Sequence, residues 1–163
     1  MSIVEELASG IEGSAELLLR YLAGFDDSNA TAQAAHLPNH AAWIVGHLAL
    51  TMHRAAEKIA GREFPLEYDP EPLAFGSKPT DRRADYPALA KLVERYKASH
   101  GLLAQSIREA GEAGLRREIN WGGRFTVTGR DLALRMLFHN GTHCGQLIDL
   151  RRALGLPSVF AGR

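Results

Sequence analysis

The sequence has little of what several common protein classes require. Cys144 is the single cysteine, which excludes an intrachain disulfide and a cysteine-rich zinc module. The apolar runs are short, far below the roughly 20 residues of a membrane-spanning helix. The opening segment carries Glu5 and Glu6 where a secretion signal needs basic residues. These absences predict a cytoplasmic protein.

An excess of charge of either sign is also missing. The chain has 19 Lys and Arg against 19 Asp and Glu, and its pI is about 7.1. Proteins that coat nucleic acid or bind anionic membranes need a basic excess, so we expect neither as a partner. A small-molecule substrate is the partner we expect. With 163 residues, the chain suits a single domain, 1–163, with its own core.

Helical periodicity is the main pattern that is present. Apolar residues recur at three- and four-residue steps in four segments. The predicted helices span residues 2–24, 39–60, 86–110 and 128–154. The predicted fold class is therefore all-α, a four-helix bundle.

Capping residues mark the ends of these helices. Asn39 is the predicted N-cap of the second helix and Asp85 that of the third. The fourth opens at Thr128, with Asp131 three residues later in a variant of the capping box. Gly61 supplies the expected stop of the second helix.

Two connections carry further information. Residues 61–84 contain four prolines and little periodicity, and such a long link inside a small domain is usually functional or a crossover. Its extended length exceeds that of a helix, so it can return along the bundle and make the second and third helices parallel. We therefore predict an up-down-down-up bundle with a long crossover between helices two and three. Residues 118–128 favour a short extended segment or hairpin.

Two of the seven histidines stand one helical turn apart. His139 and His143 lie at i and i+4, so their side chains share a helix face and can converge on one ion. His36 and His40 have the same spacing, but Pro38 separates them and places His36 before the helix. We set this second pair aside. The alternative for His139 and His143 is two polar side chains on a partly exposed face.

The fourth helix has a stripe that should face the core. It consists of Leu132, Arg135, Met136, His139, His143, Leu147 and Leu150. Core-facing histidines need partners, and a shared cation supplies one. His47, midway along the second helix, should also point inward, and bundles build metal sites from facing helices.

Three neutral imidazoles with an open position are typical of a catalytic metal site. Nitrogen ligands suit Zn, Ni, Cu or Fe, and the sequence does not choose among them. Zincin chemistry is not supported, because Asn140 stands where a metalloprotease has its glutamate base. The chain has no Glu-x-x-His, which argues against a ferritin-like di-iron site.

At these residues the sequence resembles the DinB-like superfamily, also called DinB/YfiT-like metalloenzymes. The resemblance rests on residues 39–48, which read NHAAWIVGHL, on 139–148, which read HNGTHCGQLI, and on the helix ending LRRALG at 150–155. The segments match in order and separation, so the resemblance covers nearly the whole chain. The two longer motifs together are fairly specific.

The resemblance implies an up-down-down-up bundle with a three-histidine site. Carried over position by position, the metal ligands are His47, His139 and His143. It also implies a divalent ion, Ni or Zn, and a homodimer. Family members with known activity include transferases that use low-molecular-weight thiols (bacillithiol, mycothiol, glutathione) and a mycothiol-dependent isomerase. His40, His53 and His100 match no ligand position.

Catalytic and substrate-binding residues stay unassigned. Gln146, one turn beyond His143, cannot take a proton at neutral pH and favours a supporting or packing role. Arg54 and Arg135 lie on the faces of the ligands and could clamp a carboxylate, although ion pairing with nearby acids is the favoured interpretation. Cys144 should miss the metal. Trp43, Trp121 and the 61–84 link could each line a pocket, with core filling the commoner role for the tryptophans.

Three hypotheses for the function follow. The first is a metal-dependent enzyme, most specifically a thiol S-transferase and otherwise a hydrolase. The second is a non-catalytic metal-binding or stress-response bundle, for which His40 could be a fourth ligand. The third is an interaction bundle whose histidines are only hydrogen-bonded.

Overall fold

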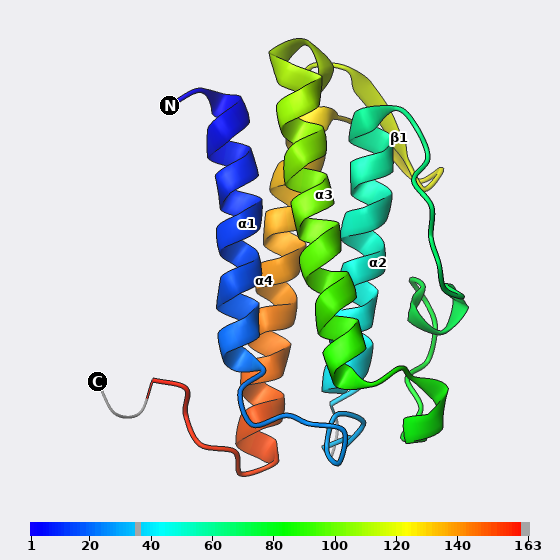
Figure 1. Cartoon of the computed structure of the whole chain (residues 1–163), viewed down its shortest axis with the longest axis vertical. Coiled ribbons are helices and arrows are strands. Elements are labelled where there is room, and N and C mark those ends of the chain that lie inside the picture. Colours follow the sequence, from blue (N-terminus) through cyan, green and yellow to red (C-terminus); the bar gives the residue numbers. More distant parts are fainter. Residues whose placement is uncertain (35–36, 161–163) are drawn as a thin grey trace.

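A computed structural model describes residues 1–34 and 37–160. In this part of the chain, four long helices pack side by side as a bundle, beside a small two-stranded sheet (Figure 1). The helices are α1 (Ile3–Tyr21), α2 (Ala41–Ala60), α3 (Leu89–Leu115) and α4 (Gly129–Ala153). The predicted helices are therefore confirmed, with differences at their ends. His36, set aside above, lies outside the described residues.

The core is apolar and lies between the four helices. Its largest fully buried side chains come from every helix: Ile11, Leu18, Ile44, Leu48, Met52, Ile59, Leu92, Tyr96, Leu103, Ile107, Leu132 and Leu147. Burial of these side chains is what stabilises helices of this length. Within the described residues, no helix combines the length and apolarity that crossing a membrane demands.

Two predicted caps are present and two are wrong. The hydroxyl of Thr128 accepts the N–H of Asp131 at 3.1 Å, and Gly61 ends α2 in the left-handed region at φ 71°, where glycine is favoured. The N-cap of α2 is His40, not Asn39, because the His40 ring accepts the N–H of Trp43 at 3.1 Å.

The start of α3 shows the second difference. Asp85 does not cap this helix, because the chain forms a 3-10 turn, η2 (Arg83–Asp85), and α3 begins only at Leu89. The first N–H of α3, that of Leu89, instead donates to the carboxylate of Asp27 at 2.7 Å. The helix also extends beyond Ala110 to Leu115, past a break at Gly111 with φ 58°.

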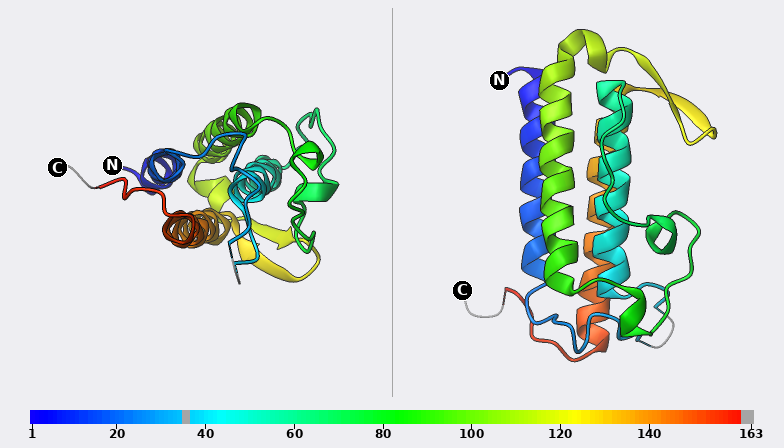
Figure 2. Two further views of the ribbon diagram at one scale, coloured as in Figure 1. Left: turned by 90° about the horizontal axis from the view of Figure 1, so that it is seen from below. Right: turned by 45° about the vertical axis from the view of Figure 1, so that its right-hand side comes forward.

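The two connections differ in structure. The link between α2 and α3 contains η1 (Glu71–Leu73) and η2, and it runs along α2 on the outside of the bundle (Figure 2). Before α4, β1 (Glu118–Trp121) and β2 (Phe125–Thr128) pair antiparallel as a hairpin. The extended segment predicted at 118–128 is confirmed.

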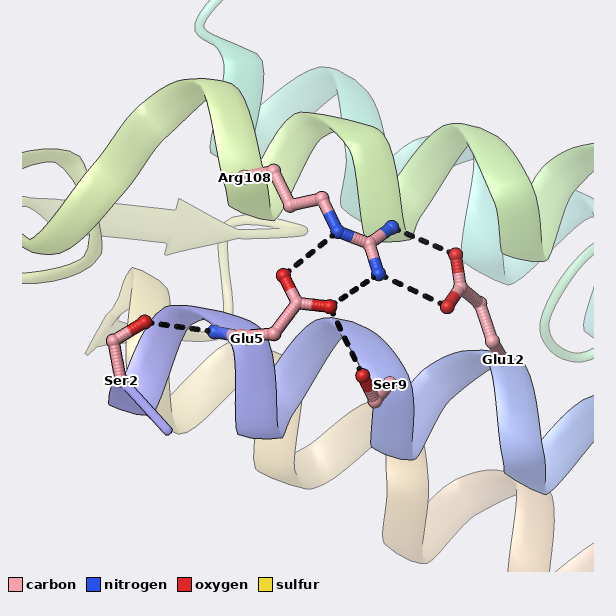
Figure 3. A network of polar contacts seen from close by, with 5 residues as sticks. All are labelled: Ser2, Glu5, Ser9, Glu12 and Arg108. Atoms are coloured by element: carbon pink, nitrogen blue, oxygen red, sulfur yellow. Dashed lines mark hydrogen bonds and ion pairs between the residues drawn. The ribbon is translucent and has the colours of Figure 1, made fainter.

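The α1–α3 side of the bundle carries a network of surface charges (Figure 3). The guanidinium of Arg108 on α3 donates to two carboxylates of α1, Glu5 at 2.8 and 3.0 Å and Glu12 at 2.7 and 3.0 Å. Ser9 donates to Glu5 at 3.1 Å, and Ser2 caps α1. Pairing with Arg108 lowers the pKa of Glu5 and of Glu12. Arg108 therefore joins α3 to α1 through four hydrogen bonds.

Candidate metal centre

Three histidines from two helices converge between α2 and α4. One ring nitrogen from each of His47, His139 and His143 lies within 4.8 Å of the other two. The ring centroid of His47 lies 5.2 Å from that of His139 and 5.3 Å from that of His143. Helical spacing brings His139 and His143 together, and the packing of α2 against α4 adds His47.

The link fixes the ring of His47. The Nδ1 of His47 lies 2.8 Å from the carbonyl oxygen of Leu73 in η1, and a carbonyl only accepts hydrogen bonds. Nδ1 therefore carries the proton and Nε2 keeps a lone pair. Gly46 leaves room for the Leu73 side chain, since a Cβ there would lie 2.5 Å from a methyl carbon of Leu73. The indole ring of Trp43 stacks on the ring of His47, with 4.5 Å between the ring centroids and 7° between the ring planes.

The amide of Gln146 fixes the ring of His143 in the same way. The Oε1 of Gln146 lies 2.9 Å from the Nδ1 of His143, and it also accepts a hydrogen bond from the side-chain Nδ2 of Asn39 at 3.1 Å. An amide oxygen is an acceptor, so Nδ1 of His143 donates and Nε2 again keeps a lone pair. Hydrogen bonds of this kind orient histidine ligands of metals and raise their basicity. Gln146 therefore has the supporting role predicted for it.

The third ring, His139, is the least satisfied. Its Nε2 lies 3.0 Å from the Nε2 of His143, and its Nδ1 is buried without a hydrogen-bond partner among the described residues. Two lone pairs that face each other at this distance need a proton or a cation between them. The three imidazoles and the facing Nε2 atoms fit a divalent transition-metal ion.

Burial keeps the three rings neutral. Desolvation, together with a smaller contribution from the neighbouring histidines, lowers the pKa of His139 to about 3 and that of His143 to about 4. Desolvation also lowers the pKa of His47, against the opposing effect of the Leu73 carbonyl. Neutral imidazole is the form that binds a metal. At neutral pH the three rings are thus in the form that can bind a cation.

The cluster is open on one side. His47 and His143 are buried, whereas His139 is partly exposed. His40 does not join it, because its two ring nitrogens bond the N–H of Trp43 and the carbonyl of Thr80. Cys144 is buried outside the cluster as predicted, and burial raises its pKa to about 11. Three protein ligands are the pattern of catalytic zinc sites, which leave a position free.

The two arginines named above have different surroundings. Arg54 pairs with the buried Glu57 at 2.9 Å, as favoured. Arg135 is exposed, which corrects its place on the core-facing stripe. Its guanidinium lies 4.8 Å from the ring centroid of Phe125 in β2 and forms no ion pair in the described part of the chain.

The remaining histidines serve other purposes. His53 lies 3.3 Å from the carbonyl of Phe64 and 3.5 Å from the carboxylate of Glu57. The Nδ1 of His100 on α3 lies 2.9 Å from the backbone carbonyl oxygen of Tyr96, one turn earlier on the same helix. Neither belongs to the three-histidine cluster.

A second buried polar network was not predicted from the sequence. The hydroxyl of Tyr96 donates to the Oδ1 of Asn140 at 2.8 Å, and the Nδ2 of Asn140 donates to the carbonyl of Ser14 at 2.8 Å. Asn140 lies between two metal-ligand candidates in the sequence but faces α1 and α3. Its burial could have been expected from the helical pattern, but its partners on two other helices could not.

Fold and site together define a class, the helical bundles with a three-histidine cluster able to hold a metal ion. A model of the DinB superfamily matches residues 11–147. The chain belongs to the DinB superfamily, as the resemblance in its motifs implied. Among curated proteins, none matches the chain.

A solved structure shares the fold. It is described as a crystal structure of the conserved protein of locus from Enterococcus faecalis. The TM-score is 0.74 at 17% sequence identity, over 95% of this chain and 99% of that chain. At this identity the similarity concerns the fold alone.

Proposed function

We propose that this protein is a cytoplasmic, metal-dependent transferase that uses a low-molecular-weight thiol. His47, His139 and His143 would hold the ion, Ni or Zn. One observation carries the proposal: three neutral imidazoles converge, two of them with Nδ1 hydrogen-bonded to an acceptor, and no fourth protein ligand joins them among the described residues.

The bound ion would supply the acidity that keeps a thiol or water deprotonated at neutral pH. In the reaction, the thiol gives its proton to solvent and its sulfur forms a bond to an electrophilic carbon. The leaving group departs with the electron pair of the bond that breaks. The chain's own residues orient the ligands: Leu73 and Gln146 through hydrogen bonds, and Trp43 through stacking.

The alternatives are a hydrolase and a non-catalytic bundle. The described cluster contains no carboxylate, so it offers no general base for activating water, which favours thiol transfer. A purely structural ion favours a closed site with four protein ligands. The partial exposure of His139 and the engagement of both His40 nitrogens elsewhere argue against that closed site.

We extend the proposal to the order of the helices and to a homodimer. In Figure 1 the colours run down α1, up α2 and α3 and down α4, which supports an up-down-down-up bundle crossed by the 61–88 link. Phe138 is 79% exposed and Leu134, one turn earlier on α4, is 46% exposed. Such apolar side chains on one helix face favour burial against a second copy. Sedimentation of wild type and Phe138→Glu tests the dimer, with a monomeric variant expected.

A transfer assay tests the function. Metal-free protein is loaded with Ni or Zn, mixed with bacillithiol, mycothiol or glutathione, and offered a fluorogenic alkylating electrophile. We expect thioether formation to need the ion and one of the thiols, and to be lost in His139→Ala. His53→Gln, which alters a histidine outside the cluster, is the matched control. Equal rates in His139→Ala and wild type would overturn the proposal.

A further inference from the structure

The link and the hairpin meet beside the three-histidine cluster. The guanidinium of Arg124, in the hairpin turn, lies 4.2 Å from the ring centroid of Phe75 in the link. That of Arg135 on α4 lies 4.8 Å from the ring centroid of Phe125 in β2. We call these four residues the rim. They join three segments that are distant in sequence, and Figure 2 shows hairpin and link beside α2.

Short chain segments connect the rim to the histidines. Phe75 follows Leu73 by two residues, at most about 7 Å of extended chain, and the Leu73 carbonyl bonds His47. Arg135 precedes His139 by one helical turn, a spacing that brings Cβ atoms to about 5–6 Å. The rim therefore lies close in the chain to residues that form or support the cluster.

The two rim arginines differ from most other arginines of the protein. Neither Arg124 nor Arg135 lies within 4.0 Å of a carboxylate in residues 1–34 and 37–160. Ion pairs are formed instead by Arg54, Arg62, Arg82, Arg83, Arg108, Arg116 and Arg152. A guanidinium on an aromatic face keeps its N–H edge free for a planar anion. The rim thus presents two uncompensated positive charges.

The aromatic part of the rim is exposed as well. Phe75 is 75% exposed and Phe125 is 39% exposed. A hydrocarbon chain laid across these rings would remove apolar surface from water. Charge and apolar surface together fit an amphipathic anion.

We infer that the rim recognises an anionic group, a carboxylate in the simplest case, on the molecule that binds at the three-histidine cluster. The substrate class is then a thiol, or its acceptor, with a carboxylate several bonds away from the reacting atom. This inference rests on the proposed function and specifies its ligand.

Three thiols of equal length provide the test: 6-mercaptohexanoate, 6-mercaptohexanol and 6-aminohexanethiol. Their remote end groups hardly change the acidity of the sulfur, so differences in affinity report the charge at the far end. Isothermal titration calorimetry on zinc-loaded protein gives the dissociation constants. We expect 6-mercaptohexanoate to bind most tightly, 6-mercaptohexanol less tightly and 6-aminohexanethiol most weakly.

The variants locate the recognition. Arg124→Gln and Arg135→Gln should each reduce the preference for 6-mercaptohexanoate over 6-mercaptohexanol about fivefold, and the double variant about tenfold or more. Arg130→Gln removes the same charge from an exposed position on α4 and should leave the preference within about twofold of wild type. A preference that survives in the double variant, or equal binding of the three thiols, overturns the inference.

Two further arms separate the sources of failure. If hexanoate competes with 6-mercaptohexanol, the carboxylate belongs to the thiol; if both bind together, it belongs to the acceptor. Should no thiol bind to zinc-loaded protein, the proposed function is wrong. In that case NMR titrations of metal-free protein with hexanoate and with hexanol test the rim alone. Hexanoate binding that is lost in the double variant supports the inference. No binding of hexanoate to wild type rejects the inference.

Discussion

Two buried polar clusters flank α4, and their hydrogen bonding differs. Asn140 bonds Tyr96 of α3 and Ser14 of α1, so both ends of its amide have protein partners. His139 and His143 face α2, where their Nε2 atoms lie 3.0 Å apart and the Nδ1 of His139 has no partner among the described residues. A buried polar group is costly unless it is paired. The amide of Asn140 is satisfied within the chain, whereas the facing Nε2 atoms of the second cluster can hold a cation.

Arginines repeat this contrast at the surface. Arg108 donates to two carboxylates and joins α1 to α3 (Figure 3). Arg124 and Arg135 rest on aromatic rings with no carboxylate partner in the described part of the chain. The α1–α3 side therefore pairs these polar groups within the fold, whereas the α2–α4 side leaves several of them without a protein partner in the described part of the chain.

The largest effect should come from removing a histidine ligand. His139→Ala should lower zinc affinity by more than about 100-fold, because even the loss of a ligand's hydrogen-bond partner costs about 10–100-fold. Competition with a fluorescent chelator measures the affinity. His100→Gln, a buried histidine outside the cluster, is the control and should bind zinc like wild type. If both variants lost zinc affinity to a similar extent, the three-histidine cluster would not be the specific zinc site.

Asn140 should show the opposite behaviour. Asn140→Leu leaves the Tyr96 hydroxyl and the Ser14 carbonyl without their partner, so we expect a loss of about 2–4 kcal/mol in the free energy of unfolding. Zinc affinity of the folded variant should stay within about threefold of wild type. Urea unfolding of the metal-free protein measures the first quantity. A stable variant that binds no zinc would reverse the roles assigned to the two clusters.

Gln146 connects the site to its support. Gln146→Leu removes the acceptor of His143 Nδ1–H, so zinc affinity should fall about 10-fold or somewhat more. Gln146→Glu restores an acceptor and should recover most of the affinity. Thr142→Ala, at an exposed position of the same helix, controls for changes in helix stability. If the zinc affinity of Gln146→Leu were unchanged, the hydrogen bond from Gln146 would not be needed to orient the ring of His143.

The last prediction concerns pH and the buried His100. Burial lowers the pKa of His100 to about 4, so below pH 6.5 the unfolded chain takes up a proton that the native protein refuses. The metal-free protein should therefore lose stability as pH falls from about 6.5 to 4, by about 1 kcal/mol per pH unit from this residue. Urea unfolding at pH 7, 6, 5 and 4 measures this slope. His100→Gln should show a shallower slope than wild type, and an identical slope would contradict the prediction.

Local signals in the sequence predicted much of the fold. Thr128 and Gly61 act on backbone groups a few residues away, so their roles can be recognised without tertiary structure. The i, i+4 spacing of His139 and His143 has the same local character. The position of His47 followed from the periodicity of one more helix.

Contacts across the fold could not be predicted. Asp27 caps α3 from 62 residues away, which displaced the expected role of Asp85. Leu73 bonds His47 from a link without periodicity, and only the packing of that link against Gly46 brings it there. Arg135 lies one helical turn before His139, so the sequence pattern placed it on the core-facing stripe. In the structure its guanidinium instead packs on the ring of Phe125 in the hairpin, outside the core.

Metal content is the most direct test of the central claim that the three histidines hold an ion. Untagged wild type and His143→Ala are purified side by side and examined by elemental analysis. We predict about one Ni or Zn per chain in wild type and none in His143→Ala, with both proteins folded by circular dichroism. No metal in wild type, even after incubation with Ni or Zn, or equal metal in both proteins, would contradict it.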